Sequence, residues 1–208
     1  MVPKVKICGI TSVEDALAAV ASGADAIGLV FYPPSKRYIK PADAAEIVAA
    51  VGPFVTTVGL FVNSTQAEVE RALQVSKVQL IQFHGDEDAD FCCQFGRPYI
   101  KAIRMAPELN PVQEIARHPQ ASGYLFDAWQ DGEYGGTGKT FDWQRIENMA
   151  GGNLILAGGL KPCNVQRAVD IVEPYGVDVS GGVEQSPGQK DQQLVKDFIV
   201  QAKQRNPA

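Results

Sequence analysis

Short apolar runs alternate along the whole chain with stretches of helical periodicity. There are eight runs, and they span residues 4–7, 25–31, 54–62, 77–83, 99–103, 124–127, 154–158 and 176–180. Their centres recur roughly every 25 residues, about the length of one strand-plus-helix unit in a small eight-fold barrel. Runs this apolar are typical of strands covered on both faces, as in parallel sheets.

The segments between the runs carry the signals of helix ends. Thr11 and Glu14 have the spacing of a capping box, as have Thr65 and Glu68, so each pair predicts a helix start. Gly23 is placed to end the first of these helices. The last helical segment has one apolar stripe, which we expect to pack into the core: Leu194, Val195, Phe198, Ile199 and Ala202.

Strict alternation of strand and helix predicts an α/β protein with a parallel sheet. Eight repeats favour closure into a (β/α)8 barrel, a TIM barrel, over an open doubly wound sheet. No linker or low-complexity tract interrupts the pattern, so we predict a single barrel domain over residues 1–208. The one long connection, residues 128–141, follows the sixth run, and we interpret it as a mobile lid over a substrate.

Composition and charge narrow the functional classes. The formal net charge is −5 and no dense run of Lys or Arg exists, which argues against a nucleic-acid partner. The apolar runs are far shorter than the ~20 residues of a membrane span. Residues 1–10 lack the pattern of a signal peptide. We expect a protein with no membrane association.

The cysteines suggest neither a metal site nor a disulfide framework. No two of them form a CxxC motif, and His84 and His118 are not at metal-ligand spacing, so we expect no metal and no cofactor. Adjacent Cys92 and Cys93 fall in a helical pattern and are both expected to be buried. Thiols without a framework favour a reducing compartment, the cytoplasm.

Glycine pairs follow the last two predicted strands. Gly158 and Gly159 follow the seventh, and Ser180, Gly181 and Gly182 follow the eighth. Loops at these two positions of a barrel commonly hold phosphate, because glycine lets the backbone N–H groups approach the anion closely. The glycines could also serve only to make tight turns. "EYGGTGKT" at residues 133–140 lacks the first glycine of a nucleotide-binding loop and is not interpreted as one.

Two carboxylates belong to predicted strands. Asp127 ends the sixth, after "YLF", where loss of hydration favours the protonated form and an acid role. It could instead cap the following loop. Asp178 lies within the eighth strand. It could contact a ligand or serve as a buried structural hydrogen-bond acceptor.

The stretch "KICGIT" places Cys8 at the end of the first strand, followed by a glycine. Lys6 shares its face of the strand, and a nearby ammonium favours the thiolate. Cys8 is therefore a candidate base or a small buried thiol. Arg37 would lie over the open end of the barrel, where its planar guanidinium is suited to bind a carboxylate. His84, at the end of the fourth strand, could act as a base or shape the site.

Several long motifs resemble one family closely. They are "KICGIT", "GADAIGLVFYPPSKRYI", "VGLFVN", "VQLIQFHG", "EYGGTGKTFDW", "AGGL" and "GVDVSGGVE". Together they are similar to the phosphoribosylanthranilate isomerases of tryptophan biosynthesis, nearly from end to end. The resemblance implies a (β/α)8 barrel, no metal or organic cofactor, and an Amadori rearrangement of N-(5-phosphoribosyl)anthranilate to 1-(2-carboxyphenylamino)-1-deoxyribulose 5-phosphate.

Roles follow by resemblance at the matching positions. Asp127 corresponds to the general acid and Cys8 to the general base. Arg37 corresponds to the arginine that holds the anthranilate carboxylate, and the "AGGL" and "SGGVE" backbones to the phosphate grip. The partner is then a small phosphorylated substrate, and the chain is expected to be a monomer, with a homodimer possible. The alternatives are another phosphosugar aldose–ketose isomerase, or a barrel that only binds a phosphorylated ligand.

Overall fold

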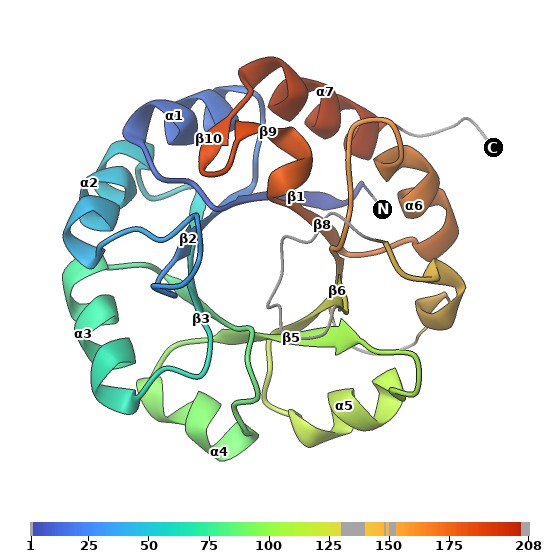
Figure 1. The fold of residues 1–208 in the computed structure, drawn as a ribbon, viewed down its shortest axis with the longest axis horizontal. Helices are drawn as coiled ribbons and strands as arrows, with labels where there is room; N and C mark the ends of the chain where they lie inside the picture. Colours follow the sequence, from blue (N-terminus) through green and yellow to red (C-terminus); the bar gives the residue numbers. More distant parts are fainter. Residues whose placement is uncertain (1, 130–139, 148, 150–152, 205–208) are drawn as a thin grey trace.

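The computed structural model describes residues 2–129, 140–147, 149 and 153–204. Eight parallel strands, β1 to β8, form a closed barrel in sequence order, and β8 pairs with β1. The α-helices surround this barrel as an outer ring (Figure 1). The predicted (β/α)8 fold is therefore confirmed.

Each strand coincides with one of the eight apolar runs, within a few residues at its ends. The strands are β1 (Lys4–Cys8), β2 (Ala26–Val30), β3 (Thr56–Phe61), β4 (Leu80–Phe83), β5 (Tyr99–Met105), β6 (Gly123–Ala128), β7 (Leu154–Leu156) and β8 (Gly176–Val179). The α-helices are α1 (Val13–Ala21), α2 (Pro41–Val51), α3 (Gln66–Ser76), α4 (Ala89–Cys92), α5 (Pro111–Arg117), α6 (Val165–Val172) and α7 (Gln192–Lys203).

Shorter elements modify the regular alternation. The 3-10 helices are η1 (Cys93–Phe95), η2 (Trp143–Ile146) and η3 (Gly181–Val183). An antiparallel hairpin of β9 (Glu184–Ser186) and β10 (Gln189–Lys190) follows η3. The sequence pattern did not predict this hairpin, which lies beside β1 and α1 in Figure 1.

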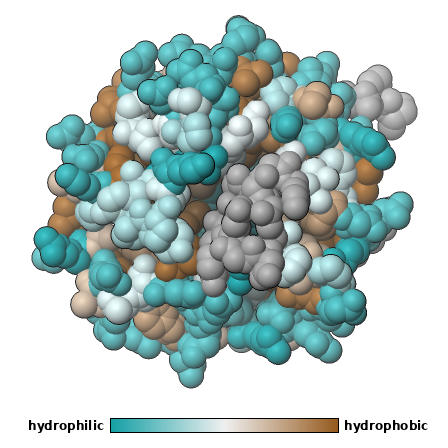
Figure 2. Space-filling view, in the orientation of Figure 1, coloured by the Kyte–Doolittle hydropathy of each residue, from teal (hydrophilic) through white to brown (hydrophobic). Residues whose placement is uncertain are grey.

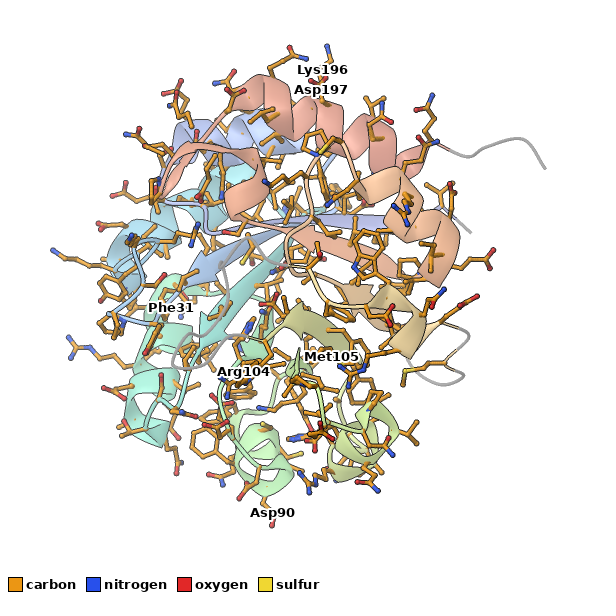
Figure 3. The ribbon with its side chains drawn as sticks, turned by 45° about the vertical axis from the view of Figure 1, so that its right-hand side comes forward. Phe31, Asp90, Arg104, Met105, Lys196 and Asp197 are labelled. Atoms are coloured by element: carbon orange, nitrogen blue, oxygen red, sulfur yellow. The ribbon has the colours of Figure 1, made fainter. Side chains whose placement is uncertain are left out.

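The core has two layers. Two small clusters lie inside the barrel; one consists of Ile100, Ala102, Leu125, Ile155 and Ala157, and the other of Cys8, Val30, Leu60 and Val62. A larger cluster fills the space between the strands and the helices, and it includes the predicted α7 stripe. Charged side chains such as Lys196 and Asp197 on α7, and Asp90 on α4, lie on the outside of the helix ring (Figure 3). None of the helices within the described ranges is long and apolar enough to cross a bilayer.

The predicted helix ends are confirmed with one exception. Thr65 and Glu68 form a complete capping box at α3, and Gly23 follows the end of α1 with φ of +99°. The box at Thr11 is wrong, because Ser12 caps α1. The Thr11 hydroxyl instead donates to the Gly188 carbonyl, 2.5 Å away in the hairpin turn. A contact between segments so distant in sequence is not visible in a local pattern.

The prediction that Cys92 and Cys93 are both buried is correct only for Cys92. Cys92 is fully buried, whereas Cys93 is exposed. The reason is that α4 ends after four residues, and the chain continues as the 3-10 helix η1. The predicted lid over residues 128–141 falls mostly outside the described residues.

Candidate active site

A cavity of about 420 Å³ opens at the carboxyl ends of the barrel strands. Hydrophilic residues dominate the rim of the face that Figure 2 shows. The cavity brings together every site residue that the sequence suggested. They are Cys8, Arg37, His84, Asp127, Gly158, Gly159, Asp178, Ser180, Gly181 and Gly182.

Cys8 lies at the end of β1, buried beside two charged groups. The Lys6 ammonium is 2.7 Å from Asp178 Oδ1, and both side chains are buried. Burial raises the pKa of the Cys8 thiol, the Lys6 ammonium opposes this shift, and the Asp178 carboxylate adds to it. Lys6 therefore favours the thiolate, as expected. The pKa of Cys8 is nevertheless raised on balance, because the loss of hydration is the larger effect.

Lys6 remains firmly cationic despite its burial. Burial alone would lower its pKa, but the charges and hydrogen bonds of Asp178 and Cys8 outweigh the loss of hydration, and the pKa of Lys6 is raised. The side chain therefore supplies a permanent positive charge next to the sulfur.

Asp127 is buried at the end of β6. Its Oδ1 accepts a hydrogen bond from the backbone N–H of Ala128 at 2.8 Å, so the loop-capping role is real. Its Oδ2 lies 3.2 Å from His84 Nε2. Gly158 provides the space: a Cβ there would lie 2.5 Å from the Ala128 nitrogen and 3.0 Å from Asp127 Oδ1. A glycine expected to contact phosphate thus also makes room for the Asp127 carboxyl group.

His84 reaches Asp127 from β4. The Gln82 amide nitrogen lies 2.9 Å from His84 Nδ1, so Nδ1 accepts and the ring proton belongs on Nε2, facing Asp127. The 3.2 Å approach of Nε2 to Asp127 is close but poorly aligned, and Nε2 has no hydrogen-bond partner among the described residues. We therefore treat it as an electrostatic contact, with a donor free to turn towards a ligand.

Arg37 is held by a carboxylate that the sequence did not single out. Its Nε and Nη2 atoms each donate to one oxygen of Glu184, both at 2.8 Å. The buried Lys190, from β10, donates to Glu184 Oε1 at 2.8 Å. Burial alone would raise the pKa of Glu184, but the two cations outweigh it and the pKa is lowered. The guanidinium is therefore fixed in place, with its Nη1 side left for a second acceptor.

The loops after β7 and β8 have the glycine geometry expected of an anion site. Gly158 and Gly159 both have positive φ, of +81° and +61°. A Cβ on Gly182 would collide with the Leu160 carbonyl, so glycine lets the two loops pack together. The Ser180 hydroxyl is buried and has no hydrogen-bond partner within the described ranges. It is therefore an available donor at the cavity.

Comparisons with known proteins agree with this geometry. A family profile described as N-(5'phosphoribosyl)anthranilate (PRA) isomerase matches residues 5–201. The chain belongs to this family. An N-(5'-phosphoribosyl)anthranilate isomerase of Hahella chejuensis is 53% identical over 194 residues, which cover 93% of this chain and 91% of the relative. Family membership makes the chain an isomerase of tryptophan biosynthesis.

Two solved structures of this isomerase family match closely. The phosphoribosyl anthranilate isomerase of Thermotoga maritima has a TM-score of 0.88 and 40% identity, over 97% of this chain and 98% of the other. A complex of the isomerase with reduced 1-(o-carboxyphenylamino)-1-deoxyribulose 5-phosphate has a TM-score of 0.83 and 39% identity, with the same coverage.

The sequence reasoning assigned no individual role to four residues beside the cavity: Gln82, Gly28, Glu184 and Lys190. Gln82 stands two residues before His84, so alternation along β4 was a usable signal. The "SPGQK" stretch around Gly188 indicates a turn. Nothing local shows that this turn brings Lys190 onto Glu184. Within the described residues, no three His, Cys, Asp or Glu side chains cluster as a metal site would require.

Proposed function

We propose that this isomerase carries out the Amadori rearrangement of N-(5-phosphoribosyl)anthranilate with Asp127 as general acid and Cys8 as general base. The observation that carries the proposal is the convergence of a buried thiol and a buried carboxyl group on one cavity, from β1 and β6. In the closed barrel, β7 and β8 separate these two strands. The two groups therefore address a bound sugar from different sides.

Asp127 acts first, as a proton donor. It protonates the furanose ring oxygen, the bond from that oxygen to C1 breaks, and the anthranilate nitrogen forms a protonated Schiff base with C1. His84 Nε2, 3.2 Å from Asp127 Oδ2, and the Ala128 N–H, 2.8 Å from Oδ1, hold the carboxyl group in position for this transfer.

Cys8 acts second, as a thiolate. It takes the proton from C2, so the C2–H bond breaks and an S–H bond forms. The electron pair becomes the C1–C2 double bond, and the Schiff-base nitrogen becomes a neutral amine. The resulting enolamine tautomerises to the ketone. No cofactor takes part in this proposal.

The two anionic ends of the substrate are bound at different places. The Nη1 side of Arg37 donates to the anthranilate carboxylate, because Glu184 already occupies the Nε–Nη2 edge. The phosphate lies on the backbone of Gly158, Gly159, Gly181 and Gly182, with the Ser180 hydroxyl as a further donor. Binding energy from both ends orients the sugar between acid and base.

His84 and Asp178 complete the polar lining, and we propose that both contact the sugar portion of the substrate. Asp178 does so with a carboxylate already held by Lys6 at 2.7 Å. Its orientation is therefore set before the ligand arrives.

The described surface and the cysteines bear on oligomeric state and compartment. Exposed large apolar side chains are scattered over the described surface and include the almost fully exposed Phe54, so we propose a monomer, with a homodimer as the alternative. The Thermotoga maritima relative is described as dimeric. All four cysteines are free, and we propose a cytoplasmic location. Light scattering of the purified protein and fractionation of the producing cells test these two points.

A coupled fluorescence assay tests the central proposal. Phosphoribosylanthranilate is generated in place, and its disappearance is followed with the purified chain. We expect conversion to the aminodeoxyribulose phosphate without added metal or cofactor. No conversion, with folding intact, would refute the activity, and conversion that survives loss of both Cys8 and Asp127 would refute the roles.

A further inference from the structure

Lys6 and Cys8 converge over the same glycine. The two residues stand on one face of β1, and Cys8 pairs in register with Gly28 of β2. A Cβ on Gly28 would lie 2.7 Å from the Cys8 sulfur and 3.1 Å from Lys6 Cε. The missing side chain of Gly28 is what lets the lysine stem pass beside the sulfur.

Asp178 holds the far end of the lysine. It lies opposite Lys6 in the β1–β8 register, and its Oδ1 accepts from Lys6 Nζ at 2.7 Å. Both side chains are more than nine-tenths buried. Attraction between charges is much stronger in such a poorly hydrated site than at the surface.

The two charges act on the sulfur with opposite signs. The ammonium of Lys6 stabilises a thiolate, and the carboxylate of Asp178 destabilises one. If the pair were present only to hold β1 and β8 together, loss of either partner would have the same kind of effect. A difference in sign separates an electrostatic role from a structural one.

We infer that Lys6 is a positioning residue for catalysis, which stabilises the Cys8 thiolate that then abstracts the proton, and that Asp178 fixes the Lys6 ammonium beside the sulfur. The inference rests on the proposed role of Cys8 as the base. It explains how a buried thiol with little hydration can act as a base in this cavity.

Two further cations face Cys8. Lys190 from β10 and Arg37 from the loop after β2 both interact with it electrostatically. Each is already bound to Glu184, at 2.8 Å. Glu184 offsets one of these two positive charges, and the effect of Lys190 on the thiol is the smallest of those resolved. Lys6 is the cation whose removal should matter most.

The test measures the thiol directly. Cys8 alkylation by iodoacetamide is followed against pH by peptide mass spectrometry, in a Cys93→Ser, Cys163→Ser background. We expect the midpoint to rise by about one pH unit or more in Lys6→Met, which corresponds to about tenfold less thiolate at neutral pH. In Asp178→Asn the amide oxygen still accepts from Lys6 Nζ and keeps the ammonium in place, while the negative charge is removed, so the midpoint should fall. Lys6→Arg, which keeps the cation, should restore most of the original midpoint.

Lys101→Met provides a matched control. Lys101 is also buried and pairs with Glu87 at 2.9 Å, but it stands on β5, four strands from β1 in the closed order. Its loss disturbs a buried ion pair without changing the charge beside Cys8, so the Cys8 midpoint should not move. If Lys6→Met does not fold, the double variant Lys6→Met, Asp178→Asn replaces it, because it removes both buried charges. Its Cys8 alkylation midpoint should lie above that of Asp178→Asn and below the value expected for Lys6→Met.

The outcomes separate the two proposals. Midpoints that do not move, or that move in the same direction in Lys6→Met and Asp178→Asn, overturn the inference about Lys6. Midpoints that move as expected while the pH dependence of kcat does not follow them support the electrostatic role but refute Cys8 as the base.

Discussion

Arg37 and Glu184 meet edge to edge: Nε and Oε1 are 2.8 Å apart, as are Nη2 and Oε2. The pair joins the loop after β2 to the segment after β8, and Lys190 supports it from the hairpin. The arginine expected to bind substrate is thus fixed before substrate arrives. A ligand carboxylate gains a donor that needs little further ordering.

Loss of this carboxylate should weaken substrate binding. In Glu184→Gln the guanidinium loses a charge-assisted bidentate partner, an interaction of about 1.5–3 kcal/mol. We expect KM to rise by about 10- to 100-fold, with a smaller change in kcat. Steady-state kinetics measure both.

Arg37→Ala serves as the reference for that prediction. It should also raise KM mainly, and an analogue without the aromatic carboxylate should bind this variant almost as weakly as the substrate does. A large further loss with that analogue would mean that Arg37 does not hold the carboxylate.

Removal of the proposed base, Cys8, should reduce turnover more than substrate binding. In Cys8→Ser we expect kcat to fall by about two to four orders of magnitude, the usual effect of losing a general base, while a product analogue still binds. In the unmodified protein the raised pKa of Cys8 means that kcat should climb with pH above neutrality, tenfold per unit until the thiol is ionised. Turnover of Cys8→Ser near the original value would rule out the assignment.

Removal of the proposed acid, Asp127, should have a similar effect on turnover. Asp127→Asn keeps the shape of a side chain that accepts from Ala128 and lies 3.2 Å from His84, but it cannot donate the same proton. We expect kcat to fall by about two to four orders of magnitude. If only KM rose, Asp127 would be a binding residue and not the acid.

His118 should make the fold sensitive to mild acid. Burial lowers its pKa to about 4, whereas an unfolded histidine titrates near about 6.5. Between these values the unfolded chain binds a proton that the folded chain excludes. Stability should therefore fall as pH drops from about 6.5 to about 4, by at most about 3 kcal/mol.

Urea denaturation across this pH range, with His118→Gln as the comparison, measures the effect. The difference between the two proteins should be nearly constant above about pH 6.5 and should shift in favour of the variant below it. His118 Nδ1 has no hydrogen-bond partner among the described residues, which fits a ring kept neutral. Parallel curves would show that other groups cause the acid sensitivity.

Prediction from sequence succeeded where the signal is local or periodic. The apolar runs repeat with the length of a βα unit, and each became a barrel strand. Strand ends then identified the cavity residues, because parallel strands carry their carboxyl ends to one face. The Thr11 capping box failed because its hydroxyl bonds to Gly188, 177 residues away. The spacing of residues within a short segment cannot reveal that a distant carbonyl group takes the hydroxyl's hydrogen bond.

By itself, the sequence determined the barrel, the end of the barrel at which the cavity opens, and the side chains that converge there. Periodic burial and strand polarity suffice for that, since they depend on neighbours in the chain. Only the tertiary structure decided which charged and polar groups pair in the cavity. The pairs are Asp178 with Lys6, Glu184 with Arg37 and Lys190, and His84 with Asp127. These pairs join distant segments, and the loss of hydration that gives them their strength exists only once the barrel has closed.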